Sequence, residues 1–167
     1  MNFLKFSLLL LFISLVVGLT PSFFRFAFNN NQTAEVIAFK KTEEVNNVKY
    51  ILTEKAKIPV YLADTEEKRI KGLGGLNSIP RDYGMFFIFD TSNFLSIWMK
   101  DMLFPIDIIW IDENFTIVHL EKNISPDTYP KIFTAPVKAR FILELNSGMS
   151  DFENYNLKSG EKVFFKK

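Results

Sequence analysis

Hydrophobic and polar positions alternate along most of the chain after residue 47, which is the pattern of half-buried β-strands. The predicted strands are residues 57–63, 84–89, 94–100, 105–111, 115–121, 139–145 and 162–166. Six or seven strands over about 120 residues, with few long helical periods, indicate a curled sheet or a sandwich. We therefore predict a mainly β (α+β) fold, a small curled sheet or barrel-like domain with one or two short helices.

One short helix is predicted from the residues at its two ends. The sequence D-T-E-E resembles a capping box, in which the Asp64 carboxylate accepts from a backbone amide and Glu67 reaches back. The helix over residues 65–71 then ends at Gly72, because glycine tolerates the left-handed conformation that a helix end needs. Residues 151–157 are the candidate for a second short helix.

The N-terminal pattern is different, because residues 6–24 contain no charged side chain. As a helix they would reach roughly 28 Å, about the thickness of the hydrocarbon layer of a membrane. An uncleaved transmembrane anchor and a cleaved signal peptide are the main alternatives, and a buried soluble helix is a third. Residues 16–21 lack a clean A-x-A-like cleavage pattern, which favours the anchor.

The hydropathy pattern divides the chain into three parts. Residues 1–28 are the membrane anchor or signal segment, residues 29–46 are a tether, and residues 47–167 are the β domain. Lys5 favours a cytoplasmic N-terminus, so we expect the soluble domain to lie outside the cytoplasm. The domain would be secreted if the N-terminal segment were cleaved.

Composition excludes several classes of site. The chain has no cysteine and a single histidine, so disulfides, thiolate metal sites, cysteine nucleophiles and multi-histidine metal sites are ruled out. We therefore predict no metal and no cofactor. The 20 basic and 19 acidic residues nearly balance, which argues against nucleic acid as a partner. The partners that we expect are the membrane, through the N-terminal segment, and an unknown small ligand or envelope protein.

Five segments of the chain resemble one bacterial and archaeal family, domain of unknown function 192, in their order and spacing. These segments are residues 63–73, 84–87, 98–102, 105–112 and 143–148. Trp-Met-Lys followed closely by Pro-Ile-Asp, with Gly-Met-Phe-Phe upstream, carries the resemblance. It implies a small, mainly β, barrel-like domain, often exported or anchored. It does not indicate which biochemical activity the domain has. The chain departs from the family pattern at Leu76, where an arginine is usual, and at Asp101, where asparagine is common.

Two carboxylates within apolar runs are the most informative polar residues. Asp107 shares a strand face with Ile109 and Ile111, so it lies either at the surface or buried and paired. We expect its partner to be Arg69 or Lys100, in an ion pair or in the polar floor of a pocket. Glu144 alternates with hydrophobic neighbours, which fits either the solvent face of a half-buried strand or a functional residue.

The candidate ligand-binding residues are Arg69, Trp98, Lys100, Asp107 and Glu144. No catalytic residue is assigned, because no nucleophile motif stands out. The glycine cluster of residues 72–75 follows a helix instead of opening one, so a helix stop explains it better than a phosphate-binding loop. The methionines of the domain are better explained by core packing than by copper binding, and His119 is better explained as a core or rim residue than as a ligand.

Three functions remain open. The first is a membrane-tethered, extracytoplasmic binding or accessory module of the cell envelope with a preformed pocket. The second is a carboxylate-dependent, glycosidase-like hydrolase, which would require two of Asp64, Asp107 and Glu144 to converge. The third is a protein–protein interaction module with an exposed aromatic patch. Whether the chain is an enzyme is left undecided by its motifs.

Overall fold

The computed structural model describes residues 49–166, all of which fall within one compact unit. The predicted anchor and the whole of the predicted tether lie outside these residues. Among the described residues, no helix is both long enough and apolar enough to span a membrane.

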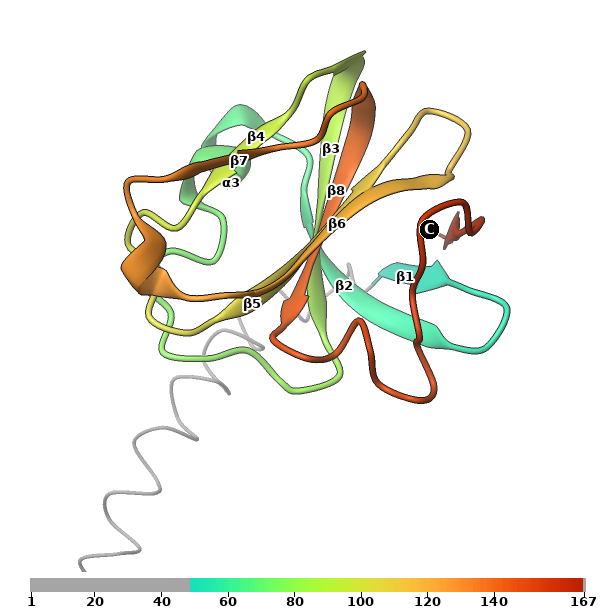
Figure 1. Ribbon diagram of the computed structural model, residues 1–167, viewed down its shortest axis with the longest axis horizontal. Helices are drawn as coiled ribbons and strands as arrows, with labels where there is room; N and C mark the ends of the chain where they lie inside the picture. The colour runs from blue at the N-terminus through green and yellow to red at the C-terminus, as the bar shows by residue number, and fades with distance from the viewer. Residues whose placement is uncertain (1–48, 167) are drawn as a thin grey trace, which may run out of the picture. The chain divides into compact units, whose positions relative to one another are not determined.

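Nine strands, one α-helix and one short 3-10 helix make up the described residues (Figure 1). In chain order they are β1 (Lys49–Leu52), β2 (Lys57–Ala63), α3 (Glu66–Lys71), β3 (Gly84–Asn93), β4 (Ser96–Trp98), β5 (Ile106–Ile111), β6 (Ile117–Ile124), η1 (Pro126–Thr128), β7 (Ile132–Thr134), β8 (Ala139–Asn146) and β9 (Phe164–Lys166). Seven strands form one sheet in the order β6-β5-β8-β3-β2-β1-β9, and β4 pairs with β7 in a separate two-stranded sheet. The fold is therefore mainly β, as predicted.

The large sheet buries both of its faces in its central strands. One face carries the main core, in which Phe86, Ile109 and Leu143 pack together. The opposite face carries the residues in between, such as Phe87, Ile108 and Ile142, which are also almost fully buried. In Figure 1, α3, β4 and β7 gather on one side of the sheet. Because β5 and β8 are covered on both faces, they read as nearly continuous hydrophobic runs.

Gly84 is required where β3 passes β8. A Cβ atom at this position would lie 2.7 Å from the Glu144 carbonyl oxygen and 2.7 Å from the Leu145 side chain. Any side chain would therefore clash, and glycine lets β3 approach β8 closely. This contact aligns Met85 opposite Glu144 in the register.

The sheet is open, so the barrel-like form of the prediction was wrong. Its two edge strands, β6 and β9, are not paired with each other. A single bridge, between Thr116 and Lys162, links the start of β6 to the segment before β9. The curled sheet is thus held at this point without becoming a closed barrel.

Local predictions met with mixed outcomes. The helix is present over Glu66–Lys71 and Gly72 ends it with φ of 49°, as predicted, but its N-cap is Thr65, whose hydroxyl accepts from the Lys68 amide. Asp64 forms an ion pair with Lys68 instead of capping the helix. The second predicted helix, residues 151–157, is a series of turns. The short strand β7 was not predicted.

Candidate functional site

A pocket of about 340 Å³ lies on the sheet face opposite the main core. Its walls come from α3, from the glycine-rich turn after it, from β3 and β4, and from Lys100, Met102 and Glu144. A second hollow, of about 440 Å³, shares Trp98 and Lys100 with it. Segments far apart in the sequence therefore meet around one cavity.

The helix α3 and the turn after it supply one wall. Arg69 donates a hydrogen bond from Nη1 to the Ile88 carbonyl oxygen at 2.8 Å, and its guanidinium lies 5.3 Å from the centre of the Phe89 ring. These contacts fix α3 against β3. The turn is tied to the opposite wall, because the Gly75 amide donates to the Asp101 carbonyl oxygen at 2.8 Å.

The small sheet supplies the other wall. Trp98 ends β4 and pairs with Ile132 of β7, and its ring meets that of Tyr129 edge-on at 6.0 Å between centroids. The Lys100 ammonium lies 5.8 Å from the centre of the Trp98 ring. Trp98 remains 52% exposed, so a large aromatic surface borders the pocket and is open to solvent.

Glu144 is the buried polar residue of this pocket. Its side chain belongs to the centre of β8, and its neighbours in register are Met85 on β3 and Ile108 on β5. The residue is only 4% exposed. Within residues 49–166, no hydrogen bond or ion pair to its carboxyl group is present. Burial among apolar side chains raises the pKa of Glu144 to about 8, so the group is mainly uncharged at neutral pH.

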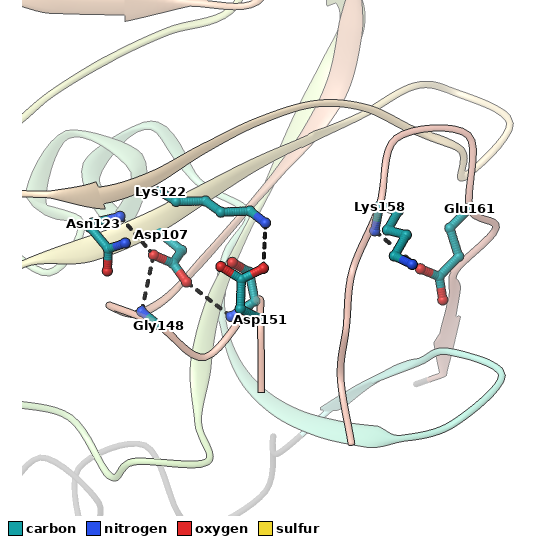
Figure 2. Close-up of polar contacts among 8 residues, drawn as sticks. Asp107, Lys122, Asn123, Gly148, Asp151, Lys158 and Glu161 are labelled. Atoms are coloured by element: carbon teal, nitrogen blue, oxygen red, sulfur yellow. Dashed lines mark hydrogen bonds and ion pairs between the residues drawn. The ribbon is translucent and has the colours of Figure 1, made fainter. Parts of the chain in front are cut away.

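Asp107 does not belong to this pocket. In the register it lies beside Leu145, on the face of the main core, whereas Glu144 points to the opposite face. Both of its carboxylate oxygens accept backbone amides: Oδ1 from Asn123 at 2.9 Å and Gly148 at 3.2 Å, and Oδ2 from Ser150 at 2.9 Å. Figure 2 shows Asp107 between the backbone of Asn123 and that of Gly148. The prediction that Arg69 or Lys100 pairs with it was wrong.

The structure thus brings four of the predicted residues to one cavity and leaves the fifth out. Arg69, Trp98, Lys100 and Glu144 all line the pocket. The prediction that Glu144 could lie on a solvent face was wrong, because both faces of β8 are covered. Sequence reasoning missed the remaining lining residues, which include Glu66, Ile70, Lys71, Phe87, Phe89, Ile97 and Met102. The only sequence feature that pointed to Met102 was its place in the family-like segment of residues 98–102, which begins at Trp98.

The carboxylate pairs expected of a glycosidase-like hydrolase are not assembled here. Asp107 and Glu144 lie on opposite faces of the sheet. Asp64 is exposed and pairs with Lys68 at 3.0 Å. Of these three carboxylates, only Glu144 lines the pocket. Among the described residues, no group of three or more histidine or acidic side chains is arranged to hold a metal ion.

The family model DUF192, described as an uncharacterized ACR, matches residues 49–165. The chain belongs to the DUF192 family. This match covers every residue that lines the pocket and all of the sheet except Lys166, the last residue of β9. A search of curated proteins finds no match.

Two solved structures share the DUF192 fold of this chain. One is a Sinorhizobium meliloti 1021 protein described as a candidate transcription regulator, with 24% identity and a TM-score of 0.63 over 70% of this chain and 91% of that one. The other is a protein of unknown function from Novosphingobium aromaticivorans DSM 12444, with 22% identity and a TM-score of 0.62 over 70% of this chain and 83% of that one. At these identities the likeness concerns the fold alone.

Proposed function

We propose that residues 49–166 form a small-ligand binding module whose site is the pocket at Glu144. The observation that carries this proposal is a carboxyl group that is almost fully buried, lines a cavity and has no partner among the described residues. A ligand that fills the cavity can offer Glu144 the missing hydrogen bond.

The free energy of folding supports the same proposal. Burial among apolar side chains deprives the Glu144 carboxyl group of part of its hydration, so we expect a leucine at this position to stabilise the fold. A residue that weakens the fold and faces a cavity is typical of a binding site. The other lining residues are mostly apolar, as is common in pockets that bind small organic molecules.

We place this module outside the cytoplasm, tethered to the membrane by the apolar segment of residues 6–24. This placement rests on the sequence, because the segment lies outside the described residues. An accessory role in the cell envelope follows from it. A protein partner is the alternative occupant of the same surface, because Ile70, Trp98 and Ile132 are 78%, 52% and 59% exposed.

A fragment screen followed by backbone amide NMR tests the proposal. The full chain, held in detergent, is titrated with a library of small aromatic and aliphatic fragments. We expect the fragments that bind to shift the amides of Gly72, Gly74, Ile97 and Met102, which surround the cavity. The proposal fails if no fragment perturbs these amides or if the bound fragments map elsewhere.

A pair of variants provides the control. Trp98→Ala removes an exposed aromatic ring beside the pocket, and Phe164→Ala removes one from β9, which does not line it. We expect fragment affinity to fall about tenfold in the first variant and to stay the same in the second. Equal losses in both would indicate non-specific adsorption to exposed rings.

A further inference from the structure

The charges of the pocket are distributed unevenly between its mouth and its floor. Arg69, Lys71 and Lys100 line the cavity, and Glu66 is the one acidic lining residue apart from Glu144. Lys71 and Lys100 are exposed, whereas Glu144 is buried. With Glu144 uncharged, three cations and one anion give the lining a formal charge of +2.

The cations at the mouth form no salt bridge in the described range, although the charge of Arg69 helps to lower the pKa values of the nearby Asp64 and Glu67. The salt bridges within residues 49–166 join other residues, and none includes Arg69, Lys71 or Lys100. Arg69 donates one hydrogen bond to the Ile88 carbonyl oxygen, and the Lys100 ammonium lies near the Trp98 ring. Such a mouth attracts an anion and repels a cation.

Apolar side chains make up much of the remaining lining of the same cavity. They are Leu73, Phe87, Phe89, Ile97 and Met102. A ligand that reaches from mouth to floor must therefore have an apolar middle. It must also carry a polar group at its inner end, because an apolar tip would leave the Glu144 carboxyl without a hydrogen bond.

We propose that the ligand is a small amphipathic organic acid. Its carboxylate or phosphate lies at the mouth beside Lys71 and Lys100, its apolar body fills the middle, and its inner end offers a hydroxyl or amide to Glu144. This inference rests on the ligand-binding function proposed above and adds the chemical class and the orientation of the ligand. An uncharged Glu144 can both donate and accept such a hydrogen bond.

The volume of the cavity favours a compact soluble acid over a membrane lipid. At about 340 Å³ the cavity is near the lower end of the range for small-molecule sites. It suits a single ring with a short acidic arm. The acyl chains of a phospholipid exceed it, although a phospholipid headgroup carries the same anionic chemistry and must be tested as a competitor.

Four matched probes test the proposal by isothermal titration calorimetry on the full chain in detergent at neutral pH. They are 3-(4-hydroxyphenyl)propanoate, 3-phenylpropanoate, the uncharged amide of the latter and the corresponding amine. We expect the acid to bind about tenfold more tightly than the amide, and the amine to bind most weakly. We expect the ring hydroxyl to add about three- to tenfold.

Variants assign each end of the ligand. Lys100→Gln should weaken both acids about three- to fivefold and leave the amide unchanged, whereas Lys55→Gln, at an exposed lysine outside the pocket, should change neither. Glu144→Leu should abolish the advantage of the hydroxyl and leave the preference for the acid intact. If Glu144→Leu still bound the hydroxylated acid more tightly than 3-phenylpropanoate, the proposed orientation would be overturned.

The remaining outcomes separate this inference from the proposed function. Binding of the amide and the amine as tightly as the acid would overturn the anionic class but leave a small-ligand pocket. Failure of all four probes, together with no fragment at the pocket amides, would overturn both. Displacement of the bound acid by phosphatidylglycerol vesicles, but not by phosphatidylcholine vesicles, would overturn the soluble acid in favour of a lipid headgroup.

Discussion

Two carboxylates of similar sequence context have opposite roles because they point to opposite faces of one sheet. Asp107 and Glu144 both interrupt apolar runs on neighbouring strands, β5 and β8. Asp107 accepts three backbone amides, whereas Glu144 has no partner among the described residues. The difference is one of register, because Asp107 aligns with Leu145 and not with Glu144. At the scale of the residue, the candidate site therefore depends on Glu144.

The stability of the protein should depend on pH through Glu144. Its pKa rises from 4.5 to about 8 on folding, so between these values the folded state holds a proton that the unfolded state has released. The free energy of unfolding should therefore fall as pH rises through this window. Glu144→Gln removes this dependence. The free energy of unfolding of Glu144→Gln minus that of the parent should therefore rise by on the order of 3–5 kcal/mol between pH 4 and pH 9.

Chemical denaturation of the two proteins across this pH range measures the difference. Glu66→Gln, which changes an exposed carboxylate in the lining of the same pocket, is the matched control and should show no such trend. A constant difference between Glu144→Gln and the parent at all pH values would mean that folding leaves the pKa of Glu144 unchanged.

At the scale of the element, Asp107 joins three segments that the strand pattern leaves separate. It belongs to β5, it accepts an amide from Asn123 near the end of β6, and it accepts those of Gly148 and Ser150 after β8. Asn123 has a positive φ of 55° and Gly148 one of 81°. A carboxylate that fixes such loops replaces the ladder bonds that they lack.

Asp107→Asn should destabilise the fold while leaving the pocket chemistry unchanged. Asparagine keeps the shape but loses the charge and one acceptor, so we expect the free energy of unfolding to fall by about 3 kcal/mol. Urea denaturation measures the change. Asp90→Asn, at an exposed position of β3, should alter stability by less than about 0.5 kcal/mol. A loss of fragment binding without a loss of stability would instead give Asp107 a functional role.

The elements were predicted with unequal success for a physical reason. Long strands such as β5 and β8 bury whole side-chain rows, so their hydrophobic pattern marks them clearly. The three-residue strand β7 has almost no pattern of its own and exists because it pairs with β4, more than thirty residues away in the chain. The turns at residues 151–157 have apolar contacts but no continuous helical hydrogen bonding.

At the scale of the whole molecule, the N-terminal segment should decide where the β domain resides. We expect the full chain, fused at its C-terminus to alkaline phosphatase, to stay with bacterial membranes after an alkaline carbonate wash. The enzyme should be active, because it requires an extracytoplasmic location. Deleting residues 6–24 should move the fusion to the cytosol and abolish its activity.

Two other outcomes of the fusion experiment carry different conclusions. A shortened, active product that is released from the membrane would indicate a cleaved signal peptide. An inactive fusion in the cytosol, despite an intact N-terminal segment, would contradict the extracytoplasmic placement.

The sequence alone determined the class of the fold, most of the strands and the short helix, and it put Arg69, Trp98, Lys100 and Glu144 among the candidate ligand-binding residues. These features depend on local periodicity and on motifs that are read along the chain. Only the tertiary structure decided that the sheet stays open, that Asp107 satisfies backbone amides and that Glu144 lies unpaired in a pocket. These outcomes depend on register between strands and on which face each element covers, and a change of one residue in register would reverse every side chain.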